Sequence, residues 1–335
     1  MEWVKNIFVN TAENRARMFW RISVQLGLFV LFSFLASIVL TFAYRKMADV
    51  EAGASVSQSQ LMEFVVNNLY AMSLYTLLTG GAICVSVWVA IRIMDRRRIA
   101  DYGLNLSKRW WEEFWFGILV GGGLIALVFG FELAAGWITV DAVLAGSPGK
   151  IVAGLTVLAF NFIFVGFYEE FISRGYHLTN FAQGFRGILG ARGSILLGMV
   201  LSAGIFGIAH IGNPEATVMT SVNIMVVGVI LLGLGYVFTG RLAIPIGMHI
   251  TWNFFQGAVF GFPVSGRTGS WAKVFTITQH GNPVWTGGKF GPEGGLIGTI
   301  AVLIGAGVII WWLKYKDGKV GLATEIARYE QTDEL

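Results

Sequence analysis

Eight long stretches of this chain are apolar and almost free of charged side chains. Each lies near the roughly 20 residues that an α-helix needs to cross the hydrocarbon core of a bilayer. Charged residues make up only 13% of the chain, about half the share found in a soluble globular domain, which places most of the sequence in lipid. The sequence therefore predicts an all-α, polytopic membrane protein with about eight transmembrane helices, at residues 22–44, 72–91, 114–137, 151–167, 194–211, 217–238, 242–260 and 296–313.

The segments outside these stretches are short, so one integral domain is the economical organisation. We expect an amphipathic cytoplasmic leader at residues 1–21, an integral membrane domain at 22–313 and a cytoplasmic tail at 314–335. The first apolar stretch exceeds the ~7 to 15 residues of a signal peptide and ends in Arg45 and Lys46 without a small-residue cleavage site, so we retain it as a helix. Residues 261–295, rich in Gly and turn dipeptides, are expected to form an ordered external loop.

The distribution of basic residues predicts the orientation of the chain. With eight spans both termini lie on one side, and all but six of the 24 lysines and arginines fall on that side. Because an excess of Lys and Arg marks cytoplasmic loops, we expect both termini in the cytoplasm. The net charge of +4 therefore needs no nucleic-acid partner. The six residues on the opposite side are Arg45, Lys46, Lys150, Arg267, Lys273 and Lys289.

Polar side chains inside the apolar stretches are few and grouped. A charged residue at the centre of a membrane helix costs roughly 2.5 to 3.5 kcal/mol on insertion scales, so its presence calls for a function. Taken singly, each group has an ordinary structural interpretation, as an interfacial helix end, a packing residue or a hydrogen bond between helices. Glu132, in the third stretch, is equally compatible with packing and with a pathway role. The groups are Glu169 and Glu170 with Arg174, Phe206 with His210, and His249 with Asn253.

Spacing within each group places its side chains on one helical face, because residues four apart are neighbours on a helix. Glu170 can therefore pair with Arg174, which offsets the cost of burying a carboxylate. Glu169 lies about 100° around the helix and is left to face a cavity, which makes it the candidate general base. His249 and Asn253 offer two neutral hydrogen-bonding groups one turn apart, a pair suited to holding an oxyanion.

These motifs, in this order, resemble the CAAX protease and bacteriocin-processing family, which includes the type II CAAX prenyl endopeptidases. The family core covers roughly residues 150–260. Residues 101–104 and 287–293 also look like bacterial members, so we expect a prokaryotic cytoplasmic membrane as the location. The motifs are Glu-Glu-x-x-x-Arg at Glu169, Glu170 and Arg174, Phe-x-x-x-His at Phe206 and His210, and His-x-x-x-Asn at His249 and Asn253.

The resemblance implies an eight-helix intramembrane endopeptidase. In it, Glu169 and His210 activate a water molecule, and His249 and Asn253 stabilise the oxyanion of the tetrahedral intermediate. Glu170 and Arg174, with Phe206, support these groups. The implied partners are the lipid bilayer and a peptide or membrane-protein substrate, with a lipidated C-terminus as an analogy only.

Two alternatives concern the cofactor and the class of function. Glu169, His210 and His249 are residue types that bind zinc. The chain has no His-Glu-x-x-His, however, and an amide such as Asn253 is a poor zinc ligand, so we favour a mechanism that requires no cofactor. The other functions compatible with these residues are a non-catalytic scaffold or immunity protein on the same fold and a proton- or ion-coupled transporter. The complete motifs favour the protease.

A shared site also demands a particular geometry, because Glu169 lies at the end of the fourth stretch and His210 at the far end of the fifth. We therefore expect the fourth helix to continue past Arg174 to about Phe181 and the site groups to lie within about 10 Å of one another. A water-filled cavity is expected to open from the site toward the cytoplasm.

Overall fold

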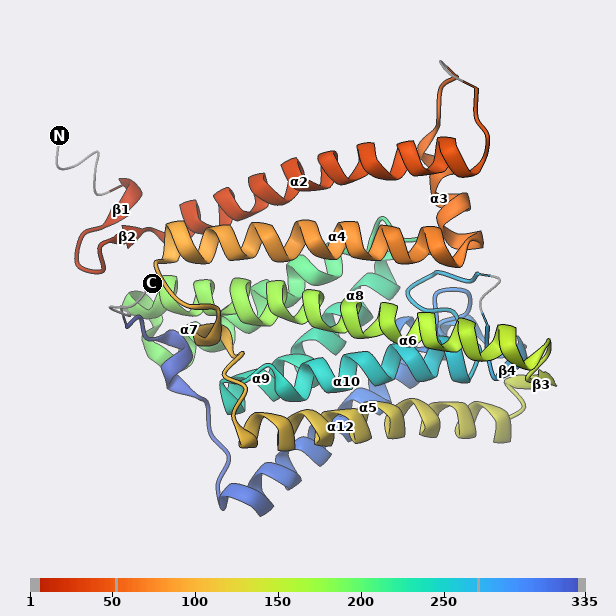
Figure 1. Cartoon of the computed structure of the whole chain (residues 1–335). Helices are drawn as coiled ribbons and strands as arrows, with labels where there is room; N and C mark the ends of the chain where they lie inside the picture. Colours follow the sequence, from red (N-terminus) through yellow and green to blue (C-terminus); the bar gives the residue numbers. More distant parts are fainter. Residues whose placement is uncertain (1–6, 52–53, 270–271, 331–335) are drawn as a thin grey trace.

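The computed structural model describes residues 7–51, 54–269 and 272–330, and it is a bundle of long helices that run roughly parallel to one another (Figure 1). The all-α membrane fold predicted by the sequence is confirmed. The long helices, in chain order, are α2 (Met18–Met47), α4 (Leu69–Ala90), α5 (Lys108–Ala134), α6 (Pro148–Glu170), α7 (Thr179–Ala209), α8 (Val218–Val227), α10 (Ala243–Phe254) and α12 (Leu296–Asp317).

Shorter elements connect or extend these helices. π-helical turns extend α4 (η1, Ile91–Asp95), α6 (η3, Phe171–Leu178), α8 (η4, Gly228–Gly233) and α10 (η5, Phe255–Val259). The remaining helical elements are α3 (Gln58–Asn67), η2 (Ile99–Tyr102), α9 (Leu234–Thr239), α11 (Pro283–Thr286), η6 (Pro292–Gly294) and η7 (Thr324–Ala327). The strands are β1 (Val9–Asn10), β2 (Arg15–Ala16), β3 (Ile138–Val143) and β4 (Phe275–Gln279), which pair antiparallel as β1 with β2 and β3 with β4.

Among the described residues, six helices are long and apolar enough to cross a membrane, so the predicted count of about eight is not confirmed. Two features account for the difference. Residues Pro148–Ala209 form a run of 62 helical residues that reverses direction at Gly190, so that two of the predicted spans fall within one run. The seventh predicted span is α10, of 12 residues, continued by the 5 residues of η5, which together are slightly shorter than a typical span.

The fourth helix is longer than its apolar stretch, as the sequence predicts. It continues from α6 through η3 and into α7, and the chain reverses only at Gly190, whose backbone has φ 66° and ψ 176°. This conformation is essentially restricted to glycine, because a Cβ atom clashes with the backbone there. Gly190 therefore ends the long helix and lets the rest of α7 return beside it.

Close packing of α5 against α10 fixes the helix that carries His249. Gly117 and Gly121 of α5 lie directly against the backbone carbonyls of Ile244 and Met248, and Gly247 of α10 lies against the carbonyl of Phe114. A side chain at any of these glycines would collide with the facing backbone. Gly117 and Gly121 therefore let α5 and α10 pack closely, as small residues commonly do between membrane helices.

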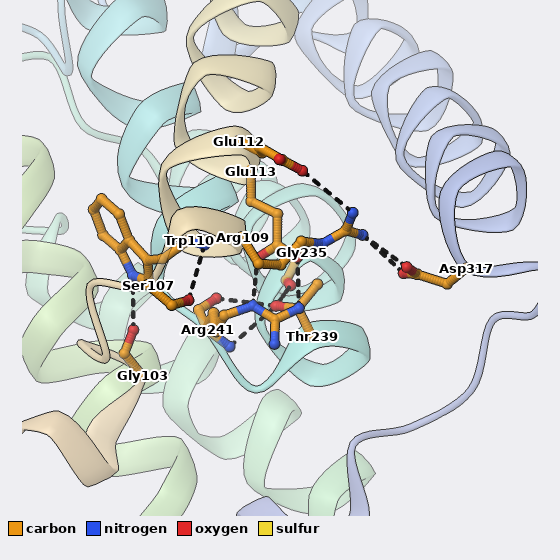
Figure 2. Close-up of polar contacts among 10 residues, drawn as sticks. All are labelled: Gly103, Ser107, Arg109, Trp110, Glu112, Glu113, Gly235, Thr239, Arg241 and Asp317. Carbon is orange, nitrogen blue, oxygen red and sulfur yellow. Dashed lines mark hydrogen bonds and ion pairs between the residues drawn. The ribbon is translucent and has the colours of Figure 1, made fainter.

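A buried carboxylate pins the same two helices at the end of the bundle (Figure 2). Glu113 of α5 is fully buried and accepts hydrogen bonds from Arg109 Nε (3.0 Å) and from Arg241 Nε (2.7 Å), which lies between α9 and α10. Arg109 also forms an ion pair with Asp317 at the end of α12 (2.9 Å). The hydrogen bond from Arg241 to Glu113 raises the pKa of this arginine. The network joins α5, α10 and α12 at one end.

Different elements lie at the two ends of the bundle. The β1–β2 hairpin and the C-terminal segment lie at one end, and α3 and the β3–β4 pair lie at the other (Figure 1). In the predicted leader, the hairpin is followed by α2, which begins at Met18 rather than after residue 21, and residues 1–6 lie outside the described residues. Part of the predicted tail is ordered, because Gln183 Nε2 of α7 donates to the carbonyl oxygens of Ile326 and Arg328.

The loop between α10 and α12 is ordered over its described residues, as predicted. Val264 and Arg267 form a tight backbone turn, and β4 pairs with β3 from the end of α5. Glu293 of η6 is buried and accepts hydrogen bonds from the backbone N–H of Ser265 (2.6 Å) and from Gln256 Nε2 of η5. This carboxylate therefore ties the loop to the end of the helix that carries His249.

Candidate active site

The predicted pair of Glu170 and Arg174 is present and lies in the interior of the protein. Both side chains are at most 1% exposed, and Arg174 Nη1 donates a hydrogen bond to Glu170 Oε1 at 2.9 Å. The same carboxylate oxygen lies 2.7 Å from Nδ1 of His249 on α10. A carboxylate oxygen can only accept, so His249 carries a proton on Nδ1. The first and third motifs therefore meet at one atom.

Two glycines bring these groups together. Gly166 of α6 packs against Ile250 of α10, and a Cβ at Gly166 would lie 2.7 Å from the Ile250 side chain and 3.0 Å from its backbone nitrogen. The close approach of the two helices lets Glu170 reach His249. Gly228 of η4 leaves room for the guanidinium of Arg174, since a Cβ there would lie 2.8 Å from Nη2. The sequence analysis does not single out either glycine, although a small residue at a close crossing is a readable signal.

Glu169 faces the other side of the same imidazole. Its side chain is 22% exposed, and its Oε2 lies 3.7 Å from Nε2 of His249. The imidazole of His249 therefore lies between two glutamates, with Glu170 on Nδ1 and Glu169 on Nε2. This position of His249 is not foreseen from its sequence motif, which pairs it with Asn253.

The ring of Phe206 joins the second motif to the other two. The guanidinium carbon of Arg174 lies 4.6 Å from the centroid of this ring, and the ring of His249 lies 6.4 Å away at 85°. The ring of His210, one turn further on, lies 4.6 Å from the ring of Phe206 at a tilt of 54°. A cation over an aromatic face and an edge-to-face ring pair are both favourable contacts. Phe206 is therefore the packing centre of the site.

His210 follows the last residue of α7 and is half-buried. Its Nδ1 lies 2.7 Å from the carbonyl oxygen of Phe206. Because a carbonyl oxygen only accepts, Nδ1 carries the proton, and Nε2 of the neutral ring is left as an acceptor. This tautomer is the one that a proton-accepting histidine requires.

Asn253 lies one turn after His249 on α10 and is half-buried. Its amide has no hydrogen-bond partner among the described residues. The structure thus joins Glu169, Glu170, Arg174, Phe206 and His249 through successive contacts, links His210 to them through Phe206, and leaves the amide of Asn253 for another group.

The donors of the zinc alternative do not form a ready ligand set. Across residues 7–51, 54–269 and 272–330, no three His, Cys, Asp or Glu side chains are grouped so that they could hold a metal ion. In the suggested set of Glu169, His210 and His249, Nδ1 of each histidine faces a protein acceptor, and Nε2 is the nitrogen that is left for another group.

The remaining histidines and Glu132 lie apart from this cluster. His177 is buried and bonds to Gln25 of α2 (3.0 Å), and His280 bonds to Thr139 of β3 (3.1 Å). Both carboxyl oxygens of Glu132 are buried without a hydrogen-bond partner among the described residues.

The sequence predicts a water-filled cavity that opens from the site toward the termini, but the described residues form a cavity elsewhere. A cavity of about 510 Å³ lies instead at the opposite end of the bundle, beside Pro214 and Glu215, which follow His210, and beside the loop at residues 261–295. None of the described residues that line it belongs to the three motifs.

The central part of the chain matches a known protein family. Residues 151–255 match the family model described as type II CAAX prenyl endopeptidase Rce1-like. The matched segment runs from α6 to the start of η5 and contains every residue of the three motifs, so the family resemblance is confirmed over this segment. Neither the curated proteins nor the solved structures gave a match.

Proposed function

We propose that this chain is an intramembrane endopeptidase that hydrolyses a peptide bond with a water molecule activated by Glu169 and His210. The observation that carries the proposal is the convergence of the three motifs on one cluster. Glu170 accepts from both Arg174 and His249, and the ring of Phe206 contacts Arg174 and both histidines. The match of this segment to an endopeptidase family supports the same reaction.

In this mechanism Glu169 is the general base. It is the less buried of the two glutamates, with a side chain that is 22% exposed, whereas the side chain of Glu170 is fully buried against Arg174. Its carboxylate accepts a proton from water while Nε2 of His210 orients the same water, and the oxygen attacks the carbonyl carbon of the substrate. The proton then passes to the leaving amine as the carbon–nitrogen bond breaks.

The oxyanion of the tetrahedral intermediate needs hydrogen-bond donors fixed in advance. We assign this role to His249 and Asn253. Glu170 holds the Nδ1 proton of His249 and so fixes the orientation of the ring. In its protonated form His249 donates from Nε2, and the amide of Asn253, one turn away, donates beside it. Glu170 and Arg174 are then positioning residues.

The substrate in this proposal is a peptide or a segment of a membrane protein. A lipidated C-terminus follows only by analogy with the matched family. The location is an integral position in a prokaryotic cytoplasmic membrane, with both termini in the cytoplasm. The mechanism requires no metal.

The test is cleavage of a fluorogenic peptide library by purified protein. The library contains prenylated and leader-type members, and the protein is compared with Glu169→Ala and His210→Ala, with and without a chelator. Glu112→Ala and His280→Ala serve as matched controls, because both residues lie outside the cluster. We expect both site variants to lose activity and both controls to keep it, with no effect of the chelator.

Four other results have distinct meanings. Loss of activity with the chelator that zinc restores would support the zinc alternative. Equal turnover in all variants would contradict the proposed site. A folded wild-type protein that cleaves no library member would favour the scaffold, and ion flux across sealed vesicles would favour the transporter.

A further inference from the structure

The cavity at the end of the bundle opposite the termini is lined by side chains of one dominant charge. It has a volume of about 510 Å³ and lies between the turn that follows α7 and the loop at residues 261–295. Three cationic side chains line it, Arg267, Lys273 and Lys289, against the single carboxylate of Glu215. Among the described residues, none of these cations has a carboxylate within ion-pair distance. The cavity therefore carries an excess of unpaired positive charge.

This concentration of charge runs against the distribution in the rest of the chain. Only six lysines and arginines are expected on the side of the membrane opposite the termini, and three of them line this one cavity. Basic residues are depleted on that side of membrane proteins. Arg267 is additionally held in place by the ring of Tyr75 on α4, with its guanidinium carbon 5.7 Å from the ring centroid. A group of unpaired cations with one fixed member is suited to an anion.

The surroundings of the cavity indicate where that anion comes from. One wall contains Pro214, in the turn between α7 and α8, and Gly266 of the loop packs directly on the carbonyl of Pro214. Both helices belong to candidate membrane spans, so the turn between them lies at the boundary between hydrocarbon and headgroups. Ile208, Ile211 and Val218, on either side of this turn, are 68%, 58% and 81% exposed. Apolar side chains exposed at this level contact lipid chains.

We propose that this cavity binds the phosphate of an anionic phospholipid headgroup, held by Arg267, Lys273 and Lys289, with the acyl chains lying over Ile208, Ile211 and Val218. A cationic pocket directly beside an exposed apolar surface matches the two parts of such a lipid. The site is separate from the proposed catalytic cluster, and its test is a binding measurement that does not depend on proteolysis.

The test uses purified full-length protein in a neutral detergent. Phosphatidylglycerol, phosphatidylcholine and inorganic phosphate are added separately, and binding is followed by native mass spectrometry and by the shift in melting temperature. The variant Arg267→Gln/Lys273→Gln is compared with Lys46→Gln/Lys150→Gln, which removes the same charge from exposed residues on the same side but outside the cavity. Wild type is expected to retain phosphatidylglycerol in preference to the other two probes.

Each cation near an anionic lipid contributes about 1 kcal/mol, so loss of two is expected to weaken phosphatidylglycerol binding about 30-fold. The control variant is expected to stay within about twofold of wild type. Lys289→Gln changes an exposed side chain and keeps the test decisive if the double variant does not fold, with an expected loss of about fivefold.

Three results would overturn the proposal. Equal losses in the cavity and control variants would mean that binding reflects diffuse surface charge. Protection by inorganic phosphate equal to that by the lipid would mean a site for free phosphate. Displacement of the lipid by a polyglutamate peptide at equal concentration would mean a surface for an acidic peptide.

Discussion

Glu170 makes more contacts within the site than Glu169, although the two carboxylates are adjacent in sequence. It is fully buried, and one of its oxygens accepts from both Arg174 and His249. Its other oxygen and Nη2 of Arg174 are buried without a hydrogen-bond partner among the described residues. Burying two charges is costly unless they stay paired, so each depends on the other.

Glu170→Ala is therefore expected to destabilise the protein by about 3 to 5 kcal/mol, because it leaves the buried guanidinium of Arg174 unpaired. Glu169→Ala removes a partly exposed carboxylate and is expected to abolish cleavage with little change in stability. Thermal unfolding in detergent, measured beside the cleavage assay, separates the two effects. Replacing both members, as Glu170→Leu/Arg174→Met, should recover part of the lost stability, and a double variant less stable than either single one would contradict this account.

At this scale the sequence predicts contacts within one helix and misses contacts between helices. The pairing of Glu170 with Arg174 follows from their four-residue spacing. The position of His249 between the two glutamates depends on how closely α6 approaches α10, which Gly166 and Ile250 determine. Spacing along a chain carries no information on that distance.

Among the elements, the reversal inside α7 depends on a single residue. Gly190 has φ 66° and ψ 176°, whereas Gly187, one turn earlier, is an ordinary helical residue with open space around its Cβ position. Both are exposed, so packing does not distinguish them.

Gly190→Ala is expected to cost about 1 to 3 kcal/mol, because the new Cβ strains a backbone conformation reserved for glycine. Gly187→Ala is the matched control and is expected to be neutral or to stabilise by up to about 1 kcal/mol, since it only removes freedom from the unfolded chain. The melting temperatures of the two variants give the comparison. Equal shifts would mean that the reversal does not depend on the backbone of Gly190.

The loop at residues 261–295 is expected to lose stability as the pH rises. Burial raises the pKa of Glu293, which lies just outside α12, to about 7 from its ordinary value of 4.5. A carboxyl group with a raised folded-state pKa contributes stability that is fully present below about 4.5 and is lost as the pH rises through about 7. The change over this window is on the order of 3 kcal/mol.

Glu293→Gln keeps the shape of the side chain and removes the titration, so its melting temperature is expected to fall less between pH 5 and pH 8 than that of wild type. Glu215→Gln, at an exposed position of the facing turn, serves as the control. Parallel pH profiles for wild type and Glu293→Gln would assign the pH dependence to other groups.

For the whole molecule, hydropathy locates the helices better than it counts them. Each predicted stretch falls largely on helical residues, but 151–167 and 194–211 belong to one run of helical residues that reverses direction at Gly190, and 242–260 is divided between α10 and a short π-helical turn. Hydropathy measures the apolar length of a segment and is insensitive to polar helical residues that continue beyond it, such as those of η3. The end of the bundle at which each connecting segment lies, by contrast, can be predicted from the order of the helices along the chain.

The orientation of the bundle is testable because the chain has one cysteine. In a Cys84→Ser background, Lys319→Cys and Lys150→Cys place single thiols at exposed positions at opposite ends. We expect a membrane-impermeant maleimide to label residue 150 in intact bacteria and residue 319 only after permeabilisation. The reverse pattern would place the termini outside the cell and contradict the charge-based prediction.

The length of the fourth helix has a mechanical consequence. Residues 148–189 form a rod of roughly 60 Å at 1.5 Å per residue, about twice the thickness of the hydrocarbon core. Glu169 and Glu170 lie near its midpoint, and Gln183, toward its end at residue 189, donates to the carbonyl oxygen of Ile326 in the C-terminal segment. If this helix is rigid and its end at residue 148 is fixed, a displacement at Gln183 moves the two carboxylates by roughly half as much. Under this condition, a force applied to the C-terminal segment outside the membrane would displace the two glutamates.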